Sequence, residues 1–460
     1  MFKLFRVAGF ALILGFAIVA LYSLAKRTDG PGMNSEMQLT NAPYGHILTN
    51  AAVWSPDSNW IVYDTRSDAA GEQFDGTRIE AVNIQTREVR VLYESKNGAH
   101  CGVASWHPKE MQIAFILGPE NPTQDWSYAA MRRQGIIVDF NTPKQSRNLD
   151  ARNLVAPYTP GALRGGSHVH MWHPIGDRLS FTYDDHVLAA SVLRNSEKNR
   201  RTIGVSIANK AVNVPKTHPR NHDGSMFSAI VADTTSQPRL GSDDIISAYE
   251  EAWIGERGYA KPDGTWQKYA LAFQGLVTSA NAQTVPEVYV LDLPDDLAQA
   301  GSGTPQTMPT PPRGTAQRRL TFTENTKYPG LHGPRHWLRS SPDGSRIGFL
   351  RKDDDGDVQF WTVSPNGGTA TASTRSTLPI TSCFTWNPAG TKVAIVVDKS
   401  VCVIDASNGK MLRLTKPSDD ASAPRPEACV FSPDGKWIAY IRRQQSQNEW
   451  FNQIFIVAVP

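Results

Sequence analysis

The sequence has little cysteine, little net charge and none of the short motifs that mark the common catalytic folds. Four cysteines are too few to cross-link a chain of 460 residues, which excludes a disulfide-stabilised scaffold. The 47 lysines and arginines against 44 aspartates and glutamates leave a formal charge of only +3, which disfavours a nucleic-acid binder with a broad basic face. Neither a Gly-x-Ser-x-Gly nucleophile elbow nor a phosphate-binding glycine-rich loop is present.

The sequence does contain ample material for a turn-rich globular fold. Its 35 glycines and 31 prolines are near ordinary abundance, which excludes a collagen-like or low-complexity chain. The 12 Trp, 13 Tyr and 17 Phe residues supply enough aromatic bulk for a large core, which excludes global disorder. A chain of this length forms one large domain or two or three ordinary ones.

The first 27 residues differ from the rest of the chain. Two cationic residues precede an uncharged run over residues 7–25, and two more follow it at once. As a helix, such a run spans about 28 Å, roughly the hydrocarbon thickness of a bilayer. We expect residues 1–27 to be a signal anchor or, because the run ends on the small residue Ala25, a cleaved signal peptide.

Either alternative exports the body of the protein, because cationic residues before an apolar segment keep the N-terminus in the cytoplasm. The predicted location is periplasmic or extracytoplasmic, with residues 7–25 as the anchor to the inner membrane and residues 28–36 as a polar tether. The four cations of the leader are Lys3, Arg6, Lys26 and Arg27. Without them 43 basic side chains face 44 acidic ones, so the folded body carries a formal charge of −1.

A short repeat recurs along the remaining chain. In most copies a strand ends in a large residue, a Pro-Asp-Gly type turn follows, and an alternating apolar strand resumes. The last two intervals between turn prolines, Pro342 to Pro388 and Pro388 to Pro433, are 46 and 45 residues, the length of one four-stranded propeller blade. The six copies begin at Trp54, Trp106, Trp172, Ser340, Trp386 and Phe431.

These repeats predict an all-β fold, a seven-bladed β-propeller over residues 37–460. A degenerate copy supplies the seventh blade in the long interval between the third and fourth repeats, where an eighth blade stays an alternative. Insertions are expected at residues 236–264 and 297–315, and the second of these is expected to be mobile because it is rich in Gly, Pro, Thr and Gln. The strands predicted for the degenerate copy are 226–232, 269–278, 287–292 and 319–322.

The N-terminal strand is expected to complete the last blade. The chain ends on an apolar third strand, residues 454–459, that lacks a fourth. The missing strand is Met37-Gln-Leu-Thr40, which matches the outer-strand segments Arg319-Leu-Thr321 and Arg413-Leu-Thr415. Pairing the first strand with the last removes a free sheet edge, so the body is one domain.

The repeats resemble the WD40-like repeat of TolB-type proteins, which are bacterial periplasmic β-propellers. Three strings outside the generic repeat resemble those of an uncharacterised bacterial branch of TolB-like propellers: Gly118-Pro-Glu-Asn-Pro122, Arg164-Gly-Gly-Ser-His-Val-His170 and Tyr249-Glu-Glu-Ala-Trp-Ile254. The resemblance implies a binding module of the cell envelope that uses its axial face. Its partner would be an envelope protein, or an acidic small molecule or oligosaccharide, and not a nucleic acid. The fold alone fixes no activity.

Histidines gather where the chain leads into the inner strands, which surround the central channel of a propeller. Seven of the eleven occupy such positions: His46, His100, His168, His170, His222, His332 and His336. They would form a metal site, bind an acidic ligand, or simply fill a solvated channel.

The candidate metal ligands are His168, His170, His332 and His336, for a divalent ion such as Mn²⁺, Fe²⁺ or Zn²⁺. Alternate residues of a strand share one side, so the first two are expected to present both imidazoles together. A second resemblance, to oligogalacturonate lyases, points the same way. These propellers bind a metal at the axial face through several histidines and a glutamine, and open an acidic sugar by β-elimination. The alternative function is therefore a metal-dependent enzyme on an acidic saccharide, with no catalytic base assigned.

An acidic ligand needs cationic donors beside these histidines. Arg164 and Arg335 suit bidentate hydrogen bonds to a carboxylate. His100 and His222 precede two further inner strands, and Glu427 stands six residues before the last turn proline. These five are the candidate ligand-binding residues.

Other polar segments are expected to be structural. The acidic run 353–357 lacks the bidentate glutamate and flanking helices of an EF-hand and predicts a charged hairpin. Residues 242–253 predict an N-capped helix whose Glu250 and Glu251 cover the channel as a lid or are solvated. The four cysteines are expected to pack as small apolar residues without disulfides.

Overall fold

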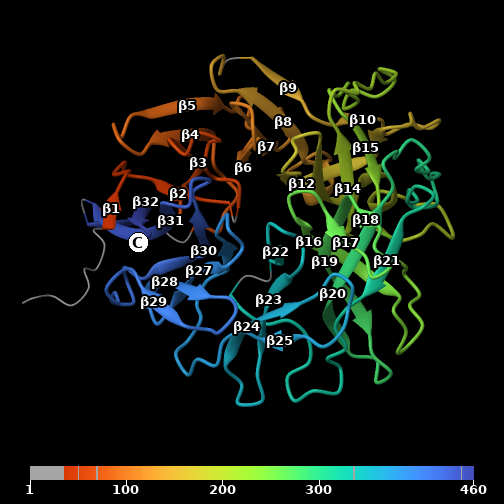
Figure 1. Ribbon diagram of the computed structural model, residues 1–460. Helices are drawn as coiled ribbons and strands as arrows, with labels where there is room; N and C mark the ends of the chain where they lie inside the picture. Colours follow the sequence, from red (N-terminus) through yellow and green to blue (C-terminus); the bar gives the residue numbers. More distant parts are fainter. Residues whose placement is uncertain (1–35, 50, 69–70, 144, 335–336, 447) are drawn as a thin grey trace, which may run out of the picture.

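Seven antiparallel four-stranded sheets stand around a central axis (Figure 1). The structure is a computed structural model that describes residues 36–49, 51–68, 71–143, 145–334, 337–446 and 448–460. The predicted seven-bladed β-propeller is confirmed, and in the described residues the interval left open for an eighth blade holds one complete sheet. The predicted signal anchor, residues 1–27, lies outside the described residues, as does the tether apart from Glu36.

The sheets are numbered here in chain order. Sheets one to three are β2 (Gly45–Ile47), β3 (Trp60–Arg66), β4 (Arg78–Asn83), β5 (Val89–Glu94); β6 (Cys101–Trp106), β7 (Gln112–Leu117), β8 (Gln134–Asp139), β9 (Ser146–Asn148); and β12 (Gly165–Trp172), β13 (Arg178–Asp185), β14 (Thr202–Ile207), β15 (Phe227–Ile230). Sheets four to six are β16 (Ile245–Trp253), β19 (Tyr269–Thr278), β20 (Thr284–Leu293), β21 (Ala316–Arg319); β22 (Arg339–Ser340), β23 (Ile347–Lys352), β24 (Val358–Val363), β25 (Thr371–Ala372); and β26 (Thr385–Trp386), β27 (Lys392–Val397), β28 (Ser400–Asp405), β29 (Met411–Arg413).

Sheet seven joins the two ends of the chain: β30 (Pro424–Phe431), β31 (Trp437–Ser446), β32 (Glu449–Ala458) and β1 (Glu36–Gln38). Short elements are β10 (Ala151–Arg152) with β11 (Ala162–Leu163), β17 (Tyr259–Ala260) with β18 (Trp266–Gln267), the 3₁₀ turn η1 (Ala130–Arg132) and the helix α2 (His186–Ala189). Across the described ranges, no helix has the length and apolar character needed to cross a membrane.

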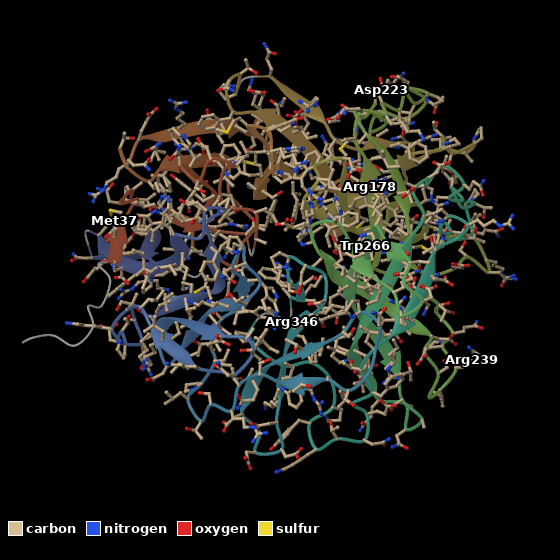
Figure 2. The ribbon with its side chains drawn as sticks, viewed as in Figure 1. Met37, Arg178, Asp223, Arg239, Trp266 and Arg346 are labelled. Atoms are coloured by element: carbon tan, nitrogen blue, oxygen red, sulfur yellow. The ribbon has the colours of Figure 1, made fainter. Side chains whose placement is uncertain are left out.

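The core lies between neighbouring sheets, where apolar side chains of both fill the space (Figure 2). One cluster packs Val62 of β3 against Phe115 of β7, and another packs Val396 of β27 against Tyr440 of β31. Each sheet therefore needs a neighbour on both faces. The four cysteines are buried and free, as expected.

The Pro-Asp-Gly turns are closed by side chains as well as backbone. Before the last turn, the Ser432 hydroxyl donates to the Asp434 carboxylate at 2.6 Å and accepts from the Trp437 N–H at 3.0 Å. Ser55 and Ser341 make the same pair of contacts in their repeats. In the acidic run, the Asp353 carboxylate accepts from two backbone N–H groups of the β23–β24 turn, which confirms a hairpin there.

The Leu-Thr pairs have a common structural role. The leucine is buried between sheets, and the threonine hydroxyl accepts from an N–H of the third strand just beyond the outer-strand ladder. Thr321 and Thr415 do this for Val288 at 2.9 Å and Val401 at 3.0 Å. Thr40 does it for Ile454 at 2.9 Å, so the N-terminal segment behaves like any other outer strand.

The fourth sheet differs from its predicted strand assignment. Residues 226–232 contain β15, which is the outer strand of sheet three, and the inner strand of sheet four is β16, where a helix was expected. The register of β16 shifts twice, between Ile245 and Ser247 and between Tyr249 and Ala252. Each bulge breaks the alternation of a strand, so the apolar residues fall at a helix-like spacing.

Ring closure is confirmed, because β1 pairs with β32 and Met37 lies opposite Ile456 (Figure 2). The Thr40 hydroxyl is buried and also donates to the Gln453 amide oxygen at 2.8 Å. Gln453 in turn donates to the Ala42 carbonyl. These contacts join residues at opposite ends of the chain.

Thr40→Val is expected to lower the free energy of unfolding by about 1–3 kcal/mol, because it leaves two buried polar groups, the Ile454 N–H and the Gln453 oxygen, without a partner. The measurement is the urea midpoint of both proteins. The matched control is Thr371→Val on the exposed outer strand β25, which should change stability by less than about 0.5 kcal/mol. Equal effects of the two substitutions would contradict the closing role of Thr40.

Candidate functional site

A cavity of about 560 Å³ lies at the axis, between the inner strands and connecting loops of five sheets. Its wall combines charged groups with aromatic rings, a composition typical of sites for small polar ligands. The charged and aromatic residues that line it are Asp64, Arg66, Glu72, Phe74, Arg133, His168, Trp337, Arg425 and Glu427.

Bulges in the inner strands shape this cavity. Val103 of β6 and Val169 of β12 line it with φ angles of +59° and +58°, a left-handed conformation that is strained for a β-branched residue. At the second bulge the register of β12 shifts between His168 and Met171. As a result His168 lines the cavity, whereas His170 is buried and its Nε2 lies 3.0 Å from the Ser167 hydroxyl. The expectation that both imidazoles share one side of the strand is therefore wrong.

Asp64 and Arg66 form a buried ion pair in the cavity wall. Their side chains are 2.7 Å apart, and the Val103 N–H donates to Asp64 at 3.2 Å. Burial raises the pKa of Asp64, although Arg66 and the Val103 N–H act in the opposite direction. Gly102 is required beside them, because a Cβ there would lie only 2.5 Å from the Asp64 carboxylate.

Arg133 brings a positive charge into the cavity without an acidic partner. Its guanidinium stacks on Tyr128 at 5.2 Å, and its Nε donates to the Tyr128 hydroxyl at 2.8 Å. In the part of the chain that the structure describes, no carboxylate lies within ion-pair distance of it. Arg425, by contrast, lies 3.7 Å from the Glu427 carboxylate.

His168 lies in the same wall. Burial, helped by the charge of Arg133, holds the pKa of His168 well below its ordinary value, so the imidazole is neutral at physiological pH. Its Nδ1 has no hydrogen-bond partner among the described residues. A neutral imidazole beside a free guanidinium offers one uncharged and one charged hydrogen-bonding group to an anion.

Among the predicted site residues that the structure describes, only His168 and Glu427 line this cavity. His332 does not line it, and its Nδ1 lies 3.1 Å from the Gly330 carbonyl. Arg335 and His336 lie outside the described residues. Over the described ranges, no three His, Cys, Asp or Glu side chains converge in a way that would hold a metal ion.

His100 and His222 lie elsewhere. His100 does not line the cavity, and its carbonyl accepts the Gly118 N–H at 2.8 Å. His222 forms a backbone bridge with Arg152 at the junction of sheets two and three. The two turn histidines, His107 and His173, accept backbone N–H groups of their own turns.

The sequence analysis missed Asp64, Arg66 and Arg133, because it considered only the residues that lead into each inner strand. Asp64 and Arg66 stand at the end of a second strand, and Arg133 stands just before a third. The loops between second and third strands open on the same face as the approaches to the inner strands. Charged residues in the loops between second and third strands were the sequence feature that could have revealed these three residues.

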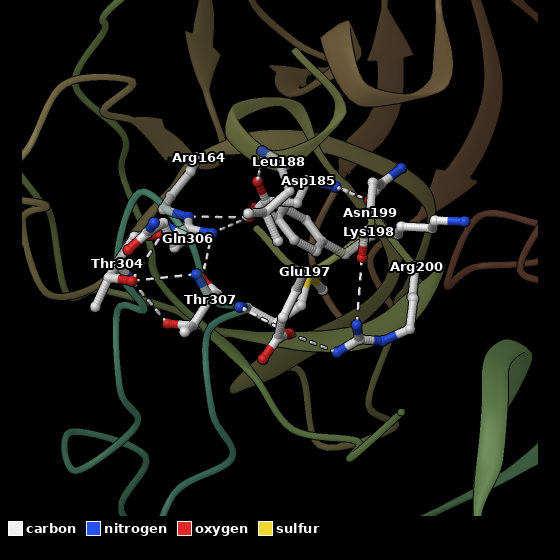
Figure 3. Close-up of polar contacts among 12 residues, drawn as sticks. Arg164, Asp185, Leu188, Glu197, Lys198, Asn199, Arg200, Thr304, Gln306 and Thr307 are labelled. Carbon is white, nitrogen blue, oxygen red and sulfur yellow. Dashed lines mark hydrogen bonds and ion pairs between the residues drawn. The ribbon is translucent and has the colours of Figure 1, made fainter. Parts of the chain in front are cut away.

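Arg164 holds a loop rather than a ligand (Figure 3). Its guanidinium is buried against the Asp185 carboxylate at 2.7 Å and donates to the carbonyls of Thr304 at 2.6 Å and Thr307 at 2.9 Å. Asp185 also accepts the Leu188 N–H at the start of α2. The segment expected to be mobile, residues 297–315, is thus tied to sheet three.

Arg164→Met is expected to lower the free energy of unfolding by about 3–5 kcal/mol, because it leaves the buried Asp185 charge unpaired. It should also expose residues 302–308 to limited proteolysis. The matched control is Arg201→Met, which removes the neighbouring, partly exposed pair with Asp184 and should cost less than about 1 kcal/mol. Urea denaturation of both variants checks the difference. Similar midpoints would contradict the role of Arg164 in holding the loop.

Glu251 is not part of a lid. It lies buried in β16, where it accepts the Thr182 hydroxyl at 3.0 Å, while Glu250 accepts from Gln274 at 2.9 Å. Burial raises the pKa of Glu251 from an ordinary 4.5 to about 7. The folded protein therefore keeps this proton between pH 4.5 and 7, whereas the unfolded chain loses it.

The raised pKa of Glu251 predicts that its contribution to stability falls as pH rises from 4.5 through 7, by up to about 3 kcal/mol. Glu251→Gln should remove this fall. The check is the free energy of unfolding of both proteins at pH 5 and pH 8. Glu88→Gln, at an exposed position, is the control, and its free energy of unfolding should change with pH as that of the parent protein does. Parallel pH profiles for the parent and Glu251→Gln would contradict the assignment.

Comparisons with known proteins place these features in context. Residues 100–222 match a family model described as a protein of unknown function, DUF3748. The Escherichia coli K12 protein YidR, described as uncharacterized, is 44% identical over 416 residues, which cover 89% of this chain and 95% of the relative.

Among solved structures, an oligogalacturonate lyase in complex with manganese has a TM-score of 0.54 at 12% identity and covers 94% of this chain and 95% of its own. The oligogalacturonate lyase of Vibrio parahaemolyticus has the same TM-score and coverage at 10% identity. A putative TolB of Agrobacterium tumefaciens has a TM-score of 0.37 at 16% identity, with 83% of this chain and 98% of the other covered. The likeness to the lyases is one of fold.

Proposed function

The chain belongs to the family of the Escherichia coli protein YidR, and we propose that its axial cavity binds an acidic saccharide or a similar small carboxylate. The observation that carries this proposal is Arg133, a guanidinium that faces the cavity without an acidic partner among the described residues. The other two arginines in the wall have carboxylates beside them. A carboxylate ligand would supply the missing charge.

The remaining wall suits a sugar acid. A volume of about 560 Å³ falls within the range of small-molecule sites. Phe74 and Trp337 add aromatic surface to the wall, and the His168 imidazole belongs to the same wall. Glu427 also lines the wall, and its carboxylate is an acceptor for hydroxyl groups.

Export of the protein through residues 1–27 belongs to the same proposal, with the propeller as a ligand-binding module of the cell envelope. Acidic saccharides are ligands that such a location makes accessible. The net charge of the body, −1, gives no support to a nucleic-acid partner.

A divalent metal is the second candidate occupant, and one oligogalacturonate lyase of this fold is described in complex with manganese. The described part of the cavity does not fit a resident metal by itself. His168 is its only imidazole, and the Asp64 carboxylate is already paired with Arg66. The metal-dependent enzyme predicted from His168, His170, His332 and His336 is the alternative function.

The proposal predicts that a galacturonate trimer binds the full-length protein and that neutral galactotriose does not, as measured by isothermal titration calorimetry. Arg133→Gln should weaken binding about tenfold or more, because it removes a charge-assisted hydrogen bond. The matched control is Arg351→Gln. Arg351 stacks on Trp361 at 5.0 Å as Arg133 stacks on Tyr128, but it does not line the cavity.

Equal affinity for the acidic and the neutral trimer would contradict the proposal. Metal analysis of protein purified without chelator tests the alternative, and less than about one-tenth of an equivalent of any transition metal would remove it. A metal-loaded protein that converts the acidic trimer to an unsaturated product, detected by ultraviolet absorbance, would favour the enzyme instead.

A further inference from the structure

A second group of cationic side chains lies on loops of sheets two and three and on β10 between these sheets. Its centre is the buried ring of Trp126, in the loop between β7 and β8. The guanidinium groups of Arg132, Arg220 and Arg152 lie 5.2, 5.5 and 5.9 Å from this ring. We call these residues, with the histidines described next, the Trp126 cluster.

Three histidines complete the cluster. The His186 ring packs edge-on against Trp126 at 4.6 Å, and the His218 ring lies at 6.2 Å. His222 is placed by its backbone bridge to Arg152. His186 Nδ1 and His222 Nε2 are buried and have no hydrogen-bond partner among the described residues, and the same holds for Arg132 Nε.

The arginines of the cluster are satisfied by carbonyls and not by carboxylates. Arg220 donates to the carbonyls of Glu120 at 2.7 Å and Asn121 at 3.0 Å, and Arg132 donates to that of Ser127 at 3.1 Å. Within the described ranges none of the three forms an ion pair. Asp150 acts on Arg152 through space and offsets part of its charge. Arg132 and Arg220 have no acidic partner among the described residues, so the cluster keeps a positive excess.

The imidazoles show the effect of this charge. Burial first, and then the charges of Arg132 and Arg152, lower the pKa of His186 to about 4. Burial and Arg152 lower the pKa of His222 to about 3. Both rings are neutral at physiological pH. The Nδ1 proton of His222 faces the Asp223 carbonyl at 3.3 Å, so of these two rings it is His186 that is able to donate a hydrogen bond to an anion. Three guanidinium groups carry more charge than one carboxylate neutralises, so a dianion with several acceptor oxygens suits the group best.

We propose that the Trp126 cluster is a second binding site, for a tetrahedral dianion such as phosphate or the phosphate group of a phosphomonoester. Arg132, Arg220 and His218 are partly exposed, so an anion reaches the cluster from solvent. Arg152 is buried behind them and contributes mainly its field. The site is separate from the axial cavity, whose wall contains none of these residues.

The test is calorimetric titration of the full-length protein with inorganic phosphate, glycerol 3-phosphate, sulfate and acetate. Phosphate should bind with a millimolar or lower Kd, and acetate should not compete. Arg132→Gln and Arg220→Gln should each weaken phosphate binding about tenfold, the loss expected for one charge-assisted hydrogen bond. Arg90→Gln is the matched control, because Arg90 also stacks on a tryptophan, Trp60 at 4.7 Å, but is paired with Glu88.

Every outcome decides the proposal. If sulfate or glycerol 3-phosphate binds and the Arg132 and Arg220 substitutions weaken that binding as they weaken phosphate binding, a tetrahedral anion site is supported. Comparison of the Kd values then shows whether free phosphate or a phosphomonoester is preferred. No phosphate binding below 10 mM, tighter binding of acetate, or indifference to both substitutions would overturn it. Melting temperatures without anion confirm that the variants fold. Since Arg133 is unchanged in these proteins, binding of the galacturonate trimer tests the axial cavity independently.

Discussion

Closure of the ring is the constraint on which the rest of this structure depends. Each sheet buries apolar side chains on both faces, so no sheet is stable without two neighbours. In an open arc the terminal sheets would expose those faces to water. Here β1 adds to β32, and Thr40 fixes it with buried hydrogen bonds to Gln453 and Ile454. The first and last described strands therefore belong to one sheet, although more than 400 residues separate them in sequence.

Closure also determines what lies at the axis. Inner strands that converge on a channel have no further strand to pair with, so their free edges need polar partners or water. The inner strands have bulges at Val103, Val169 and Glu250. Each bulge interrupts the hydrogen bonding to the second strand and changes the direction of neighbouring side chains. One consequence is the cavity with His168 in its wall. Another is a buried carboxylic acid in sheet four, Glu251, which follows the left-handed Glu250 as the buried His170 follows Val169.

The sequence predicted the features that repeat and missed those that occur once. The serine-aspartate turns and Leu-Thr pairs have local physical causes, a capped turn and a capped outer strand, so they recur and gave the blade count and the closure. The bulged strand β16 looked helical because a bulge destroys the period on which the prediction relied. A bulge also explains why the predicted common side for His168 and His170 was wrong. The left-handed Val169 lies between them and interrupts the alternation of the strand. Arg164 was misassigned because its partners, Asp185 and the carbonyls near residue 305, are distant in sequence.

Arg132 and Arg133 show how one loop serves two regions of the molecule. They are adjacent at the end of η1, yet Arg132 lies against Trp126 and Arg133 lines the axial cavity. This division requires a fixed backbone. Arg152 provides it by donating to the carbonyls of both residues, and Gly166 provides it by close contact, since a Cβ there would lie 2.1 Å from the Ala130 carbonyl. A buried arginine is costly unless carbonyl dipoles and a nearby acid offset its charge, as the two carbonyls and Asp150 do for Arg152. Arg152, a member of the Trp126 cluster, therefore also helps to hold Arg133 in the wall of the cavity.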